Sequence, residues 1–131
     1  MLTRFDNCLD ISVSQPQFPL TLTTQNANMD AAMHVIAKQK LRDFYRAHPQ
    51  AKLQLEVWWK VAKQAKWTEL VEVQRTFKSA EAVGRFTVFN ICGNKYRLIV
   101  DVKYGWGRIY VRHVLTHAEY DKGKWKNDPH F

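Results

Sequence analysis

The 131-residue sequence has few cysteines, no long apolar run and no internal repeat. Two cysteines, Cys8 and Cys92, are too few for a disulfide framework, and a metal site would need closely spaced pairs. No stretch approaches the roughly 18 consecutive apolar residues that cross a bilayer. The N-terminal residues also lack the apolar core of a signal peptide, because Asp6 and Asp10 interrupt them. We therefore expect a cytoplasmic protein without membrane partners.

The motifs of several enzyme classes are absent as well. The sequence contains no Ser or Cys nucleophile motif, no glycine-rich phosphate loop and no paired carboxylates in a catalytic arrangement. His113 and His117 have the spacing of a zinc-binding pair on a helix, but a strand-to-helix junction is expected between them and no third ligand is evident. We expect neither a metal nor a cofactor.

Charge is the first positive clue to function. Twenty Lys and Arg against 12 Asp and Glu give a net charge of +8, and the pI is about 9.7. This balance favours a polyanionic partner such as nucleic acid, a membrane surface or an acidic protein. A basic solvated surface without any anionic partner is the alternative. Apolar residues make up 46% of the chain, which is enough for the core of one domain.

The chain divides into two regions of different composition. Residues 1–32 are rich in Ser, Thr, Gln and Asn and show no sustained period, so we interpret them as a disordered or loosely attached extension. Residues 33–131 form the expected domain. Either Met29 or Met33 fits an authentic translation start, and Met33 is favoured because an organised pattern begins there.

The first half of this domain is predicted to be mainly helical. Residues 34–36 fit a short strand, and residues 38–47 have the period of an amphipathic helix. His48–Pro49 breaks this helix, and a second helix is expected over residues 49–66, which produces a helical hairpin. Residues 67–77 fit either a strand or a short helix, and we interpret them as a short helix.

The second half of the domain alternates with period 2. Strands are expected over residues 85–91, 95–104 and 108–115, joined by short turns that contain Gly93 and Gly107. Three such strands form an antiparallel meander, and the helical hairpin should cover one of its faces and leave the other partly open. The predicted fold is therefore α+β, with two N-terminal helices packed on an antiparallel sheet of three to four strands and a short C-terminal helix.

Strand alternation predicts a basic surface on the open face of the sheet. On the middle strand, the side away from the core carries Lys95, Arg97, Ile99, Asp101 and Lys103. Strict alternation on the last strand places Tyr110 and Arg112 on one face, and the opposite face then carries Ile109, Val111, His113 and Leu115. If Tyr110 and Arg112 join Arg97, this face can grip an RNA backbone. An ordinary solvated sheet face is the alternative.

The sharpest local signal follows the last strand. Thr116 and Glu119 have the spacing of a capping box, so a helix should begin there with His117 in its first turn and Tyr120 on nearly the same side. Backbone N–H groups at a helix start attract phosphate. Cleavage of RNA by its own 2′-hydroxyl needs a base, an acid and cations around the phosphorus, and no metal. A histidine that is merely exposed is the alternative for His117.

Three separated motifs resemble one family. They are Val88-Phe-Asn-Ile-Cys-Gly-Asn-Lys-Tyr-Arg-Leu98, Ile109-Tyr-Val-Arg112 and Thr116-His-Ala-Glu-Tyr-Asp121, and Met33-His-Val-Ile36 matches a typical family start. In this order and spacing they resemble the HigB-type toxins of the RelE-like toxin–antitoxin superfamily, over about residues 33–126. Residues 1–32 lie outside the resemblance.

The resemblance implies a toxin that cleaves mRNA, generally on the ribosome, and that a HigA-type antitoxin with a helix-turn-helix domain neutralises. By position, Arg97 matches the superfamily's phosphate-binding arginine, His117 a basic catalytic group, and Tyr120 a functional tyrosine. We therefore expect Arg97, His117 and Tyr120 to be catalytic; the expected RNA-binding residues are Lys95, Lys103, Tyr110 and Arg112. Two alternatives remain: a basic RNA- or ribosome-binding module without catalysis, and an inactive toxin that acts only with its antitoxin.

Overall fold

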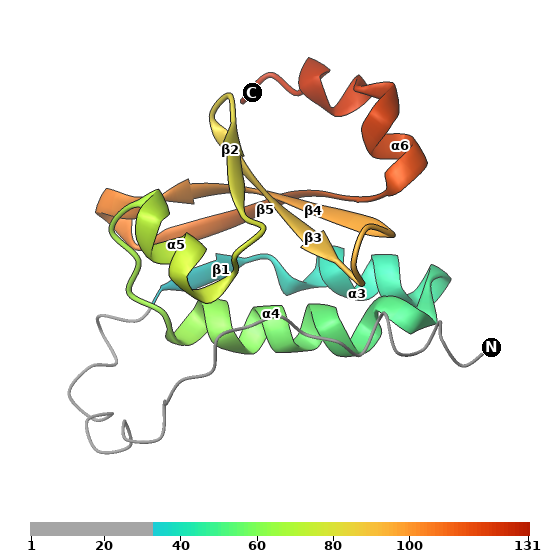
Figure 1. Cartoon of the computed structure of the whole chain (residues 1–131). Helices are drawn as coiled ribbons and strands as arrows, with labels where there is room; N and C mark the ends of the chain where they lie inside the picture. The colour runs from blue at the N-terminus through green and yellow to red at the C-terminus, as the bar shows by residue number, and fades with distance from the viewer. Residues whose placement is uncertain (1–32) are drawn as a thin grey trace.

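The computed structural model describes residues 33–131, and the expected extension over residues 1–32 lies outside the described residues, as does Met29. The elements, in chain order, are β1 (His34–Ile36), α3 (Lys38–Ala47), η2 (Pro49–Ala51), α4 (Lys52–Gln64), α5 (Leu70–Thr76), β2 (Glu81–Val83), β3 (Phe86–Ile91), β4 (Tyr96–Lys103), η3 (Tyr104–Trp106), β5 (Arg108–Thr116), α6 (His117–Lys122) and η4 (Lys124–Asn127). The fold is α+β, as predicted, and Figure 1 shows its two helices beneath a twisted sheet.

The sheet has five strands in the order β1-β5-β4-β3-β2. Strands β3, β4 and β5 form the predicted antiparallel meander. Two three-residue edge strands extend it beyond the predicted three to four: β2 pairs antiparallel with β3, and β1 pairs parallel with β5 through His34 and Arg108. Segments this short carry too few residues for period 2 to be read from the sequence, which explains why β2 was not predicted.

Helices α3 and α4 cover one face of the sheet and form the main core with it (Figure 1). From α4, Leu55 and Trp58 are buried, and Trp58 packs edge-on against Phe89 of β3 with ring centroids 5.5 Å apart. Leu98 and Val100 of β4 are fully buried in the same cluster. These positions are the core face that alternation predicted for β4, so the opposite face of β4 is the one available for function.

The C-terminal residues cover the middle of that opposite face, which the sequence had predicted to be partly open. Trp125 of η4 is buried in a second apolar cluster with Phe86, Val88 and Ile99, and Tyr120 and Phe131 pack partly buried against it. Ile99 is therefore a core residue, although alternation placed it on an open surface. Accessible side chains of this face include Arg97 beside α6 and Lys103 beside η3.

A β-bulge in β5 overturns the predicted alternation of that strand. Ile99 lies opposite His113 but its neighbour Val100 lies opposite Val111, so Arg112 is an extra residue without a partner on β4. Beyond the bulge, His113 and Leu115 face the same side as Arg97, not the core side where strict alternation had placed them with Val111. The sequence carries a signal of this shift, because two consecutive polar residues stand between the core residues Val111 and Val114.

Candidate functional site

Arg97 and Tyr120 meet at the end of the sheet beside α6. The guanidinium carbon of Arg97 lies 5.2 Å from the centre of the Tyr120 ring, within range of a cation–π contact. The same guanidinium donates hydrogen bonds to the backbone oxygens of Asn94 and Tyr96 and to the side-chain oxygen of Asn94. Uncharged acceptors hold Arg97 in place, so its full positive charge remains available to an anion.

His117 and Lys95 line one cavity next to this pair. The cavity has a volume of about 620 Å³, and the turn residues Gly93 and Asn94 form its other wall. The backbone N–H of His117 donates to the backbone oxygen of Lys95 at 2.9 Å, which ties the start of α6 to the β3–β4 turn. Nδ1 of His117 lies 3.2 Å from a carboxylate oxygen of Asp121, and Nε2 is the ring nitrogen outside this pair.

The start of α6 differs from the expected phosphate site. The capping box is present as predicted: the backbone N–H of Glu119 donates to the Thr116 hydroxyl at 3.2 Å, and the backbone N–H of Thr116 donates to the Glu119 carboxylate at 3.0 Å. The helix has only six residues, so its dipole is small, and its cap already occupies two N–H groups. Any phosphate at this end must therefore rely on side-chain cations.

The environment of Tyr120 keeps its hydroxyl protonated. Its ring stacks on Trp125 with centroids 5.1 Å apart. Burial raises the pKa of Tyr120 above 10.0; the negative charges of Glu81 and Asp121 act in the same direction, and the positive charge of Arg97 opposes them. At neutral pH this phenol is a proton donor in contact with a cation.

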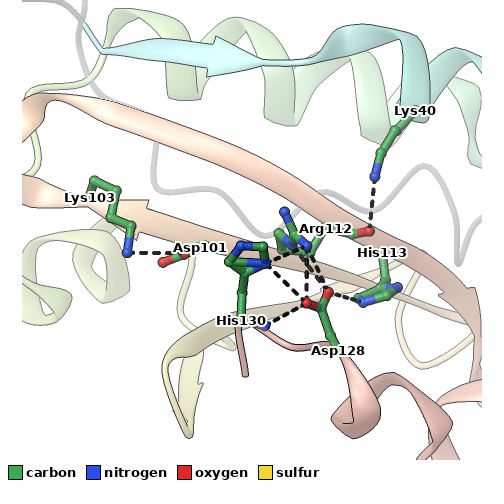
Figure 2. Close-up of polar contacts among 7 residues, drawn as sticks. All are labelled: Lys40, Asp101, Lys103, Arg112, His113, Asp128 and His130. Atoms are coloured by element: carbon green, nitrogen blue, oxygen red, sulfur yellow. Dashed lines mark hydrogen bonds and ion pairs between the residues drawn. The ribbon is translucent and has the colours of Figure 1, made fainter.

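Arg112 lies in a separate cluster around the carboxylate of Asp128 (Figure 2). Its Nε donates to one carboxylate oxygen at 3.2 Å, and its Nη2 lies 3.0 Å from both oxygens. Nε2 of His113 lies 2.9 Å from the same carboxylate, and Nδ1 of His130 lies 3.0 Å from Nη2 of Arg112. Lys40 approaches from α3, where its ammonium donates to the backbone oxygen of Arg112 at 3.5 Å. Among the contacts of the described residues, Nη1 is the part of the guanidinium left for an external anion.

Asp128 is the strongest electrostatic feature of the described residues. Its side chain is only 4% exposed, and this burial opposes its ionisation. The backbone N–H of His130, together with the side chains of Arg112 and His113, outweighs that effect and lowers the pKa of Asp128 from 3.8 to about 2. The carboxylate therefore stays charged at neutral pH and fixes the C-terminal segment to β5.

Lys103 and Tyr110 lie at the far end of the same sheet face. The Lys103 ammonium pairs with the buried carboxylate of Asp101 at 3.3 Å, as Figure 2 shows, and the Tyr110 hydroxyl accepts a hydrogen bond from Arg108 at 3.4 Å. Lys103 lies six positions after Arg97 along β4, which corresponds to about 20 Å. These two groups cannot contact the same phosphate.

The structure thus distributes the predicted residues over three places. Arg97, Tyr120, Lys95 and His117 lie together at the α6 end, Arg112 lies beneath the C-terminal segment, and Lys103 and Tyr110 lie at the η3 end. The role of Asn94 as an acceptor for Arg97 was not predicted. The role of Asp128 was not predicted either, because only the folded chain brings this residue to β5. No local pattern in residues 122–131 signals that contact.

Metal-binding clusters and membrane-spanning helices are absent from residues 33–131. No group of three or more His, Cys, Asp or Glu in this range is arranged to hold a metal ion. None of the helices in the same range is long and apolar enough to span a bilayer.

Comparison with known proteins identifies the family. Residues 51–123 match the family model of the HigB toxin, described as the RelE-like toxic component of a toxin–antitoxin system. The mRNA interferase HigB of Escherichia coli O6:H1 is 28% identical over 93 residues, which cover 69% of this chain and 90% of that protein. The mRNA interferase toxin HigB of Escherichia coli K12 is 28% identical over 92 residues, which cover 68% of this chain and 88% of that protein. The chain belongs to the HigB family of RelE-like toxins, the toxic components of toxin–antitoxin systems.

Proposed function

We propose that this toxin is a metal-independent endoribonuclease that cleaves mRNA in the cytoplasm, and that its substrate is mRNA bound to the ribosome. The observation that carries the proposal is the contact between Arg97 and Tyr120. Within residues 33–131, Arg97 is a cation without an acidic partner, and it lies beside a phenol that remains protonated. The relatives named mRNA interferase, which share 28% identity with this chain, support the same activity.

In the proposed reaction the RNA supplies its own nucleophile. A base removes the proton of a 2′-hydroxyl, the 2′-oxygen attacks the adjacent phosphorus, and the bond from phosphorus to the 5′-oxygen breaks. The leaving 5′-oxygen takes a proton from an acid, so the products are a 2′,3′-cyclic phosphate and a 5′-hydroxyl end. Arg97 offsets the additional negative charge on the pentacoordinate phosphorus, because its guanidinium presents several fixed N–H donors.

His117 and Tyr120 share the two proton transfers. The Asp121 contact to Nδ1 of His117 leaves Nε2 as the atom that exchanges a proton with RNA. The raised pKa of Tyr120 suits the donor role, since the phenol holds its proton until negative charge develops on the leaving oxygen. Lys95, which lines the cavity with His117, contacts a neighbouring phosphate.

The remaining RNA contacts lie outside this centre. Arg112 contacts the RNA backbone through Nη1, beside the C-terminal segment of the protein. Lys103 and Tyr110 contact nucleotides toward the η3 end. The antitoxin partner is a HigA-type protein with a helix-turn-helix domain, and it prevents cleavage in the complex.

The test is inducible expression of the full chain and of the double variant R97A/H117A. The wild type should arrest growth and cut mRNA, and the double variant should do neither while its circular dichroism and thermal unfolding stay unchanged. R46A is the matched control, because it removes the same charge from a side chain that is 72% exposed on α3. A double variant that still arrests growth and cuts mRNA contradicts the assignment of these residues.

A further inference from the structure

Trp106 is the most exposed large apolar residue of the described chain. Seventy percent of its surface is accessible, compared with 48% for Leu53 and 49% for Val71. It lies in η3, at the tip of the β4–β5 hairpin and at the opposite end of the sheet from α6 (Figure 1). An indole that remains in solvent on a folded surface leaves its flat aromatic face available for contact with a ligand.

The turn that carries Trp106 is built to hold it in place. The backbone N–H of Gly107 donates to the backbone oxygen of Tyr104 at 3.3 Å, and the backbone N–H of His34 donates to Gly107 at 2.9 Å. Gly107 has a φ of 66°, a left-handed conformation that a residue with a side chain adopts only with strain. Tyr104 packs against the main core. The indole is therefore presented by a fixed turn, and binding a partner costs little additional ordering.

The groups around the indole carry positive charge and aromatic surface. The guanidinium carbon of Arg108 lies 5.8 Å from the Trp106 ring, and Arg108 also donates to the Tyr110 hydroxyl at 3.4 Å. Lys103 lies opposite Arg108 in the register of β4 and β5. The carboxylate of Asp101 is 9% exposed and paired with Lys103, and burial together with the negative charges of Glu69 and Glu72 raises the pKa of Tyr104 in the same turn. On the strand side of the turn, the groups around the indole are the cations Lys103 and Arg108 and the Tyr110 ring.

We propose that Trp106, Arg108, Tyr110 and Lys103 form a binding platform for single-stranded RNA. The indole stacks on one base, and Arg108 and Lys103 contact the phosphates on either side of it. Stacking on an aromatic ring combined with adjacent cations is how proteins hold single strands without reading their sequence. The proposal rests on the proposed function, because it assigns the RNA beyond the cleaved bond to this end of the sheet.

The position of the platform agrees with an RNA path across the sheet. About 20 Å of strand separate the Arg97 end from Lys103, which is a span of several nucleotides. The C-terminal segment between the two ends carries Lys122, Lys124 and Lys126, all exposed. A strand held at Arg97 and at Trp106 thus crosses a basic surface, whereas a docked protein would have to bring acidic groups to both Arg108 and Lys103.

The test measures binding of a fluorescent single-stranded RNA oligonucleotide by anisotropy between 50 and 200 mM KCl. Full 2′-O-methyl substitution removes the nucleophile, so binding is measured without cleavage. W106A should weaken binding by about tenfold and leave the slope of log Kd against log salt unchanged, because stacking releases no counterions. W106F should retain most of the affinity. R108Q should reduce the salt slope by about 1.

V71A is the control, since Val71 is an exposed apolar residue on α5, and it should bind RNA as the wild type does. V71A should also cleave RNA at the wild-type single-turnover rate. The inference is overturned if W106A binds the oligonucleotide with wild-type affinity, or if it loses only the binding of the antitoxin. Failure of the proposed function can be distinguished from failure of this inference, because the wild-type chain would then cut no mRNA.

Discussion

Replacing Asp128 with Asn should lower the free energy of unfolding by about 2 kcal/mol at pH 7. The magnitude follows from the pKa of this carboxyl, which is 3.8 for an ordinary Asp and about 2 in the folded chain. Each factor of ten between the two acid constants corresponds to about 1.4 kcal/mol of preferential stabilisation of the charged form. The side chain is only 4% exposed, so solvent screens the contacts with Arg112 and His113 little.

The lowered pKa of Asp128 also determines how its contribution to the free energy of unfolding changes with pH. The folded pKa is lower than the unfolded one, so the stabilisation is fully present above pH 4 to 5 and is lost as the pH falls through about 2. The difference between the wild type and D128N should therefore be present at pH 5 and above and should disappear near pH 2. Comparing the two proteins at each pH cancels the titration of groups that do not contact residue 128.

Urea unfolding followed by circular dichroism measures the difference directly. D43N is the control, because Asp43 is 59% exposed and pairs with Arg46 at 3.8 Å, and exposed pairs contribute less than about 1 kcal/mol. A D128N variant that equals the wild type at pH 7 would refute the reasoning. A difference that persists unchanged at pH 2 would also refute it, because the charge of the carboxylate would then not be its source.

Two further predictions concern α6. T116A should destabilise the protein by about 1 kcal/mol in urea unfolding, because it removes the hydroxyl that accepts the Glu119 N–H; an unchanged midpoint would contradict the role of this cap. Y120F keeps the stacking on Trp125 but removes the phenolic proton. The single-turnover rate of mRNA cleavage should therefore fall about 100-fold, with little change in the affinity for RNA. A wild-type rate would exclude Tyr120 as the acid.

The elements that could be predicted from the sequence are those with a long periodic pattern or local chemistry. Apart from Ile99, the eight residues of β4 alternate between apolar and polar, and their core face is the one predicted. The capping box of Thr116 and Glu119 depends on a spacing of three residues, so it could also be predicted from the sequence. Because family motifs coincide with these same segments, Arg97 and Tyr120 were predicted at the end of the sheet where they meet.

The features that could not be predicted depend on long-range contacts. The bulge at Arg112 shifts the alternation of β5 by one residue, and a single extra residue reverses the face of every side chain after it. Asp128 reaches Arg112 across 16 residues of sequence, through a segment without periodicity. The burial of Ile99 depends on Trp125, which lies far from it in the sequence and packs with it in the second apolar cluster.

Mapping of RNA ends in cells that express the full chain tests the central claim most directly. The proposed reaction predicts new 5′ ends within mRNA coding regions that carry a hydroxyl group, because the 2′-oxygen replaces the 5′-oxygen on phosphorus. These ends should appear on induction of the wild type and be absent with R97A/H117A. Growth arrest without new mRNA ends, or new ends that carry a 5′-phosphate, would contradict the account.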